Sequence, residues 1–240
     1  MESKNSKAIQ WLAISIIAAS VIISGTILYT KNQSNFSNKN TQEQQQTKEQ
    51  QTVTNVDIVK VKISGEPFVG NINAPVVVAY WFDYQCPFCK RFEEESIDGI
   101  VNDYVKKGKV KVVFKDYQFL GPDSITAGLA EQAVWETAPD KFYEWQKAMF
   151  DKQDGENSGW GNKKDVLALT KSLGIDSAKV DNLMTSKAVE YQKEMDDDKA
   201  EGLEFGIQGT PGSIIGNELI AGAYPYSQVK AAIEAVLNGK

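Results

Sequence analysis

Residues 76–89 read VVVAYWFDYQCPFC, and this stretch decides the fold. Its first seven residues form a continuous apolar, β-branched and aromatic run, which is typical of a strand buried on both faces. After a polar turn over 83–85, a helix is predicted from Pro87 to about Lys106, with Gly108 as its end signal. The helical periodicity assigns the buried side of this helix to Cys89, Phe92, Ile97, Ile100, Val101 and Tyr104.

The two cysteines lie at the junction of this strand and this helix. Cys86 is expected at the N-cap and Pro87 at the first helical position, where a fixed φ fits and the missing N–H costs nothing. The free N–H groups and the positive end of the helix dipole favour the Cys86 thiolate, so its pKa is expected below the ~8.5 of a free thiol. Cys89 is expected deeper in the core. The spacing predicts Cys86 as an exposed nucleophile and Cys89 as the thiol that resolves a mixed disulfide.

The composition excludes several other kinds of chemistry. The 240 residues include no histidine, which excludes imidazole bases, Ser-His and Cys-His pairs and His-ligated metal sites. A net charge of -6 argues against a nucleic-acid partner. No metal and no cofactor is predicted. Two other interpretations of the cysteine pair stay open: an inert structural disulfide, although so short a loop adds only roughly 2 kcal/mol, and a copper-delivering pair, although such sites normally recruit imidazole or thioether ligands.

The N-terminal segment divides into two parts. Residues 8–29 contain no charge, and a helix of that length reaches about 33 Å, enough to span the hydrocarbon core of a bilayer. Residues 31–55 are mostly Asn, Gln, Ser, Thr, Lys and Glu, a composition typical of a flexible tether. A cleaved signal peptide is the alternative to an uncleaved anchor. The predicted organisation is a membrane anchor at 1–30, a linker at 31–55 and a globular domain at 56–240.

The rest of the chain completes the fold. A second strand is predicted at 110–114, and between 124 and about 205 the pattern is helical, with no evident strand. Two strands across a Gly216-Asn217 turn and an amphipathic helix follow. The predicted boundaries are 124–137, 139–152, 164–173, 177–184 and from 188 for the helices of the block, 213–215 and 218–221 for the strands, and 226–237 for the last helix. This order, β-α-β, helical block, β-β-α, predicts an α/β thioredoxin-like fold with an inserted all-helical subdomain at about 124–205.

Three motifs carry a resemblance to a known family. DYQCPFC after the first strand, FKDYQFL at 114–120 and GTPG at 209–212 resemble the corresponding segments of the DsbA-like disulfide oxidoreductases, particularly their membrane-anchored members. The resemblance covers about residues 56–240. It implies that Pro211 is a cis-proline opposite the cysteines, with Thr210 before it, and that the backbone of this pair offers strand-like hydrogen bonds to a bound substrate. The alternative is that residues 209–212 form only a turn, since most X-Pro bonds are trans.

The sequence departs from the family pattern at two places. The dipeptide between the cysteines is Pro87-Phe88, where the best-known strong oxidants of the family carry a histidine, which implies a weaker oxidant. Many relatives also have a buried glutamate six residues before the first cysteine, and here that position is Tyr80. Lys115 and Asp116 are the candidates to replace that glutamate in the route of the Cys89 proton.

Two further patterns are interpreted as structural. The acidic triplets at 93–95 and 196–198 lack the spaced oxygen pattern of a calcium loop and are expected on solvated helix faces. Phe142, Tyr143, Trp145 and Phe150 recur near helical spacing. Such a pattern favours a core, with a peptide groove as the alternative.

The resemblance implies an extracytoplasmic enzyme that introduces disulfide bonds into cysteine-containing secreted or surface proteins through Cys86 and Cys89. A membrane quinone-linked thiol oxidase of the DsbB or vitamin K epoxide reductase (VKOR) type would reoxidise it. The expected location is the cell membrane, with a single pass of residues 8–29 through the lipid bilayer and the catalytic domain outside. Two alternatives stay open: a reductase or isomerase, and a membrane-tethered peptide-binding module whose thiols are incidental.

Overall fold

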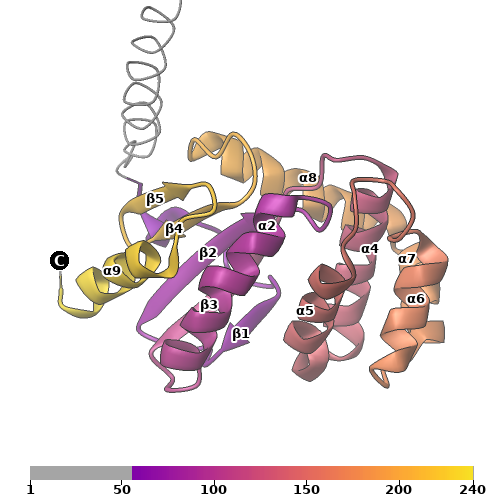
Figure 1. Cartoon of the computed structure of the whole chain (residues 1–240), viewed down its shortest axis with the longest axis horizontal. Coiled ribbons are helices and arrows are strands. Elements are labelled where there is room, and N and C mark those ends of the chain that lie inside the picture. Colours follow the sequence, from indigo (N-terminus) through magenta and orange to yellow (C-terminus); the bar gives the residue numbers. More distant parts are fainter. Residues whose placement is uncertain (1–55, 240) are drawn as a thin grey trace, which may run out of the picture. The chain divides into compact units, whose positions relative to one another are not determined.

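A five-stranded sheet organises the part of the chain that the computed structural model describes, residues 56–239 (Figure 1). The strand order is β1-β3-β2-β4-β5, with β2 and β3 parallel and every other neighbouring pair antiparallel. The strands are β1 (Phe68–Gly70), β2 (Val76–Phe82), β3 (Val110–Asp116), β4 (Gly212–Ile215) and β5 (Glu218–Ala221). The four predicted strands are confirmed, β3 is two residues longer than predicted, and β1 is an edge strand too short to show a periodic pattern.

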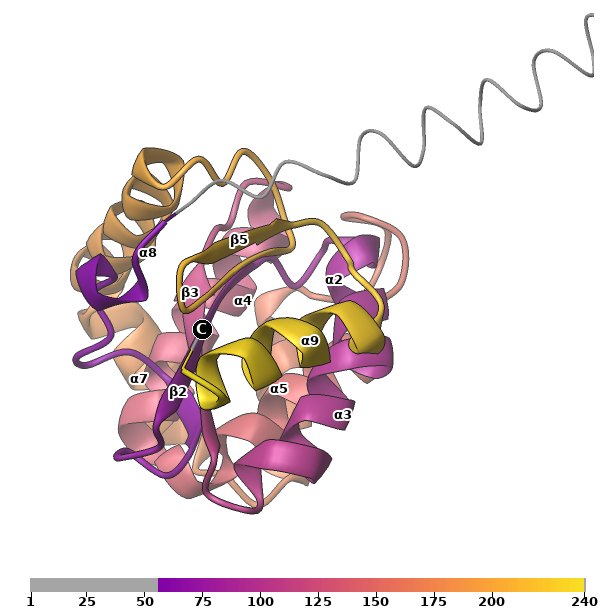
Figure 2. The same ribbon diagram turned by 90° about the vertical axis from the view of Figure 1, so that its left-hand side faces the viewer.

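The helix after β2 runs without a break over residues 87–105, close to the predicted bounds, but it is not a uniform α-helix. It consists of α2 (Pro87–Phe92), the π-helical turn η2 (Glu93–Ile97), α3 (Asp98–Ile100) and a second π-helical turn, η3 (Val101–Val105). Its six predicted core residues are all buried. The last helix, α9 (Tyr226–Leu237), packs beside η2 and α3 on the same face of the sheet (Figure 2).

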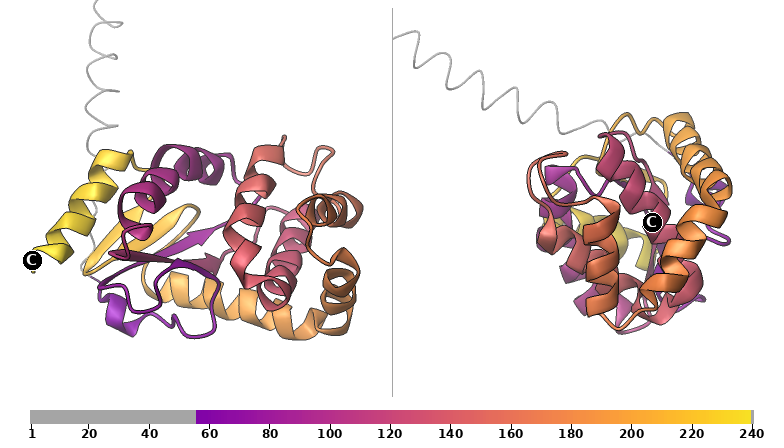
Figure 3. Two further views of the ribbon diagram at one scale, coloured as in Figure 1. Left: turned by 90° about the horizontal axis from the view of Figure 1, so that it is seen from below. Right: turned by 90° about the vertical axis from the view of Figure 1, so that its right-hand side faces the viewer.

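The predicted all-helical insertion is confirmed, and it occupies residues 122–204. It contains α4 (Pro122–Thr137), the 3-10 turn η4 (Pro139–Lys141), α5 (Phe142–Lys152), α6 (Lys163–Ser172), α7 (Ser177–Ser186) and α8 (Ala188–Glu204). Asn162 and Asp176 cap the N-termini of α6 and α7 by accepting hydrogen bonds from backbone N–H groups of the first turns. The chain then returns along α8, which crosses the face of the sheet opposite to α2 and α9 (Figure 3).

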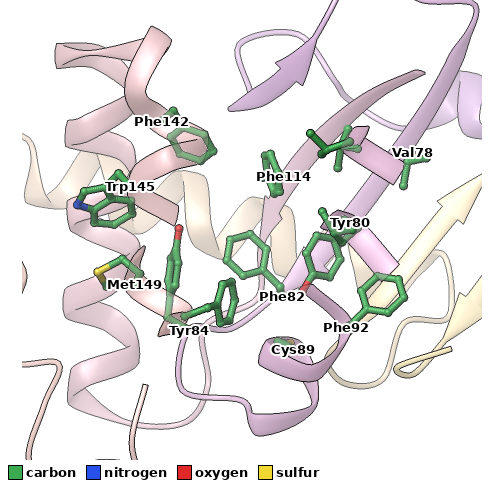
Figure 4. Packing of buried hydrophobic residues seen from close by; sticks show 14 of the residues in the cluster. Val78, Tyr80, Phe82, Tyr84, Cys89, Phe92, Phe114, Phe142, Trp145 and Met149 are labelled. Carbon is green, nitrogen blue, oxygen red and sulfur yellow. The ribbon is translucent and has the colours of Figure 1, made fainter. Parts of the chain in front are cut away.

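Two apolar layers cover the sheet. The larger one joins β2, β3, α2, α9 and the insertion, and within it Tyr84 packs between Phe82 and Trp145 (Figure 4). Phe142 and Trp145 are also fully buried in this layer, so the core interpretation of these aromatics is confirmed. The smaller layer lies on the opposite face of the sheet and includes Val61, Ala79, Trp81, Tyr117, Ile207, Ile214 and Leu219.

A buried ionic cluster accompanies the smaller layer. The fully buried Lys115 Nζ lies 3.0 Å from a carboxylate oxygen of Glu66 and 3.1 Å from one of Glu201, and it also pairs with Asp198. The prediction that residues 196–198 are all solvated is therefore wrong for Asp198, because this carboxylate turns inward to the lysine. The prediction for 93–95 is wrong for Glu93, which is 2% exposed.

None of the helices between residues 56 and 239 is long and apolar enough to cross a membrane. The predicted anchor at 8–29 and the predicted linker at 31–55 lie outside the described residues.

Candidate active site

The turn that carries Cys86 is held by one buried carboxylate. Asp83 ends the buried run of β2, and its Oδ1 accepts the backbone N–H of Gln85 at 2.8 Å. Its Oδ2 accepts from the N–H of Phe119 at 2.9 Å, from the N–H of Leu120 at 3.2 Å and from Ser124 Oγ at 2.6 Å. The sequence indicated only a polar turn here. The Asx-type bond to Gln85 is local and detectable from sequence, whereas the other three bonds come from the loop after β3 and from the first turn of α4.

Cys86 is the N-cap of α2 and Pro87 is its first residue, as predicted. The Cys86 carbonyl accepts the backbone N–H groups of Cys89 at 3.0 Å and Lys90 at 3.2 Å. The expectation of an exposed Cys86 is wrong for this dithiol form, because the residue is only 5% exposed and Cys89 is fully buried. By contrast, Phe88 is 55% exposed, and the Arg91 guanidinium lies 5.1 Å from the centre of its ring.

A distant segment of the chain closes over the Cys86 sulfur. The Thr210–Pro211 peptide bond is cis, as the resemblance implies, and the Cys86 thiol donates to the Thr210 carbonyl oxygen at 3.4 Å. This contact joins residues 124 positions apart. The Thr210 hydroxyl is buried and has no other hydrogen-bond partner. The hydroxyl can therefore donate a hydrogen bond to the Cys86 sulfur once Cys86 has lost its proton.

The two thiols differ sharply in acidity. A hydrogen bond from the Cys89 thiol, together with bonds from the Thr210 side chain and the backbone N–H groups of Cys89 and Phe88, lowers the pKa of Cys86 from 9.0 to about 6 and outweighs the opposing effect of burial. Burial, followed by the neighbouring Cys86, raises the pKa of Cys89 well above its ordinary value. Near neutral pH one sulfur is a thiolate at a helix N-terminus and the other is a thiol in the core.

The insertion also holds the redox turn directly. Gln153, which follows α5, donates from Nε2 to the carbonyl oxygens of Tyr84 at 2.6 Å and Cys86 at 3.0 Å. Gln85 Oε1 in turn accepts the N–H of Asn157 at 3.0 Å. Sequence reasoning missed Gln153, because a single glutamine at the end of a helix carries no signal of its distant partners.

The comparison with protein families agrees with this geometry. The family model described as thioredoxin matches residues 62–235. The chain belongs to the thioredoxin family. Within it, the chain is a DsbA-like thiol-disulfide oxidoreductase, since it is 31% identical over 181 residues to disulfide bond formation protein D of Bacillus subtilis, covering 74% of this chain and 80% of that protein. A probable disulfide bond formation protein D of Bacillus anthracis is 26% identical, with 73% and 80% covered.

Solved structures of this family share the fold. The oxidised form of BdbD from Bacillus subtilis superposes with a TM-score of 0.70 at 28% identity, covering 78% of this chain and all of that one. The thiol-disulfide exchange protein alpha-DsbA2 of Wolbachia pipientis superposes with a TM-score of 0.64 at 23% identity, covering 72% and 88%, and supports the fold alone. The thioredoxin-like sheet with a helical insertion is thus common to these proteins.

Neither candidate for the buried acid lies beside Cys89. The parallel register pairs Lys115 with Trp81, and both side chains lie on the face of the sheet opposite to Cys89, so the Lys115 prediction is wrong. The Asp116 carboxylate is instead bound by Gln118 Nε2 at 2.5 Å and by Gln132 Nε2 at 2.6 Å.

Proposed function

We propose that this protein introduces disulfide bonds into secreted or surface proteins outside the cytoplasm, using Cys86 and Cys89 as its redox pair. The observation that carries the proposal is the position of Cys86 at the N-terminus of α2 against the cis Thr210–Pro211 pair, with Cys89 fully buried. A substrate thiolate attacks Cys86 Sγ, the Cys86–Cys89 bond breaks, and a substrate–Cys86 mixed disulfide forms. A second substrate thiolate then attacks the substrate sulfur of that bond and releases Cys86 as a thiolate.

The acidity of Cys86 favours this direction of electron flow. A pKa of about 6 instead of 9.0 stabilises the reduced protein at pH 7 by about 1.4 kcal/mol, which is about 30 mV for a two-electron couple. The helix N-terminus contributes to this shift but no imidazolium can, since the chain has no histidine. We expect a potential between that of thioredoxin, about -270 mV, and that of DsbA, about -120 mV.

Two groups are proposed to receive the substrate, and a third to position the Cys86 sulfur. The backbone of Thr210 and Pro211 offers hydrogen bonds to an extended segment next to the sulfur, because this pair directly precedes β4. The exposed ring of Phe88 supplies apolar contact area beside the cysteines. Pro87 fixes the first turn of α2 and thereby the position of the Cys86 sulfur.

The proposed setting is the outer face of the cell membrane. Residues 1–30 would anchor the chain through a span at 8–29, residues 31–55 would tether it, and residues 56–240 would act outside, where disulfides persist. The electron acceptor would be a membrane quinone-linked thiol oxidase of the DsbB or VKOR type. Protease treatment of intact cells should therefore remove the domain and leave the N-terminus, and a protected domain contradicts this topology.

The function is tested by equilibrating the protein with glutathione redox buffers and by adding the oxidised form to a reduced, unfolded protein that needs disulfides. The expected results are a potential in the stated interval and substrate oxidation that Cys86→Ser abolishes. A potential at or below that of thioredoxin supports a reductase instead. A protein that exchanges no disulfide at all is a peptide-binding module with incidental thiols.

A further inference from the structure

A buried glutamate lies one helical turn beyond Cys89. Glu93 follows Cys89 by four residues on the continuous helix and is 2% exposed. Its Oε1 accepts from Gln146 Nε2 of α5 at 3.1 Å, whereas its Oε2 is buried without a hydrogen-bond partner. Glu93 is also the first residue of the π-helical turn η2, and such turns are frequent at functional sites. An orphaned carboxylate oxygen in a core needs an explanation, because each unpaired buried polar atom costs stability.

A second orphaned group connects Glu93 with Cys89. Tyr80 of β2 is fully buried, and its hydroxyl has no hydrogen-bond partner within ordinary limits. Its ring stacks on Phe82 and packs against Phe92 of α2, and its hydroxyl points toward Cys89 on the same helix (Figure 4). After burial, the groups that raise the pKa of Tyr80 most are Cys89 and Glu93. The charges of Cys89 and Glu93 therefore both act on the Tyr80 hydroxyl.

A partly exposed ion pair acts on Glu93. Asp98, about one-third exposed, pairs with the similarly exposed Lys147 at 2.5 Å. Asp98 also accepts from the Tyr143 hydroxyl at 2.9 Å. These are the charged and titratable groups of η2, α3 and α5 that act on Glu93, with Asp98 raising its pKa and Lys147 lowering it.

One further group on which Glu93 acts is a buried, neutral tyrosine. Burial raises the pKa of Tyr84, which follows β2, well above the ordinary value, and the charge of Glu93 adds to this rise. Helix α9 packs against η2 as well, but its charged side chains, Lys230 and Glu234, are not among the groups that shift the pKa of Glu93. Glu93 is thus a buried acid one helical turn from Cys89, and the partly exposed pair of Asp98 and Lys147 acts on it.

We propose that Glu93 and Tyr80 form the proton relay of the buried thiol, with Glu93 as the acid and base and Tyr80 as the bridge to Cys89. When a substrate thiolate attacks Cys86, the electron pair of the breaking disulfide bond goes to Cys89. The Tyr80 hydroxyl gives its proton to that thiolate and takes one from the Glu93 carboxylic acid. When the protein is reoxidised, the proton returns to the Glu93 carboxylate as Cys89 re-forms its bond with Cys86.

The electrostatics match this role. Burial, with a smaller effect of Asp98, raises the pKa of Glu93 to about 8, so the acid keeps its proton near neutral pH but releases it readily. Without a donor, the leaving Cys89 would be a bare thiolate in an apolar core, which is strongly disfavoured. The relay places the acid after the second cysteine, on the same helix, rather than on β2.

The relay rests on the proposed function, and it is tested by pH-dependent kinetics. The oxidised full chain is mixed with reduced glutathione over a pH range that brackets the pKa of Glu93, and mixed-disulfide formation is followed by acid quench. Rates are divided by the concentration of glutathione thiolate, which removes the titration of the attacking group. The variants are Glu93→Gln, which keeps the shape and the bond to Gln146, Tyr80→Phe, which keeps the ring, and Glu94→Gln as the exposed neighbouring control.

For the wild type, the normalised rate should fall above pH about 8 as Glu93 loses its proton. Glu93→Gln and Tyr80→Phe should be about 100-fold slower at neutral pH, the lower range for general acid catalysis, and should lack this inflection. Glu94→Gln should keep the wild-type profile, and the alkylation pKa of Cys86 should be unchanged in Glu93→Gln. A merely structural Glu93 would change thermal stability but keep the inflection.

If Glu93→Gln or Tyr80→Phe reproduces the wild-type profile, the relay is wrong while the proposed function stands. If wild-type protein exchanges no disulfide with glutathione, the proposed function itself fails.

Discussion

The Thr210 hydroxyl offers the most direct control of the redox potential. In Thr210→Val the β-branched shape is kept and only the buried hydroxyl, which has no other partner, is lost. A hydrogen bond to a charged group contributes about 1.5 to 3 kcal/mol, so the lower value corresponds to a rise of about one unit in the pKa of Cys86. Starting from a pKa of about 6, the reduced form loses about 1 kcal/mol at pH 7, and the potential falls by about 20 mV.

The assay is equilibration with glutathione buffers at pH 7, combined with the pH dependence of Cys86 alkylation on the same samples. Thr210→Ser keeps the hydroxyl and serves as the control, with a potential close to that of the wild type. The two measurements must move together, because the argument derives the potential from the pKa. A valine variant with an unchanged alkylation pKa refutes the hydrogen bond from Thr210, and a shifted pKa with an unchanged potential refutes the link between them.

Three further predictions concern other groups. At mildly acidic pH, iodoacetamide should modify Cys86 well before Cys89, because of the two thiols only Cys86 has a lowered pKa. Mass spectrometry of the peptides measures the two rates of modification, and equal rates would contradict the prediction. Phe88→His should raise the potential by about 30 mV for each unit that a nearby imidazolium lowers the pKa of Cys86, measured against glutathione, and no change means that position 88 does not act on the sulfur. Burial, followed by the charge of Asp116, raises the pKa of Glu131 above its unfolded value, so the folded state holds a proton that the unfolded state has lost. Stability is therefore greatest near and below the unfolded pKa of about 4.3 and falls as the pH rises toward the folded pKa, by up to about 1.4 kcal/mol per pH unit. Glu131→Gln should flatten this decline in urea unfolding at acidic and alkaline pH, and an unchanged slope would count against the buried acid.

Local patterns predicted most of the fold and the centre of the site. The apolar run of β2, the helical periodicity after Pro87 and the turn at Gly216-Asn217 each specify an element through near neighbours, and the observed elements follow them. The N-cap position of Cys86 was predictable for the same reason, because a strand that leads directly into a helix leaves few other places for it.

Long-range partners account for what the sequence did not predict. Asp198 and Glu93 belong to acidic triplets that resemble solvated faces, yet each turns inward, toward Lys115 and Gln146 respectively. Only the four-residue spacing from Cys89 could have singled out Glu93, since it places the carboxylate on the buried stripe of the helix. Strand β1 has three residues and is specified by its pairing with β3 rather than by its own sequence.

The bonds that Asp83 and Gln153 make around the turn keep the position of the Cys86 sulfur independent of the outer surfaces of α6 and α7. Both side chains fasten the backbone around Cys86 to the near edge of the insertion, so the outer surfaces of α6 and α7 can change without moving the sulfur. Sequence changes on those outer surfaces would therefore leave the redox chemistry of Cys86 as it is. A change at Asp83, by contrast, would free both the turn that carries Cys86 and its attachment to α4.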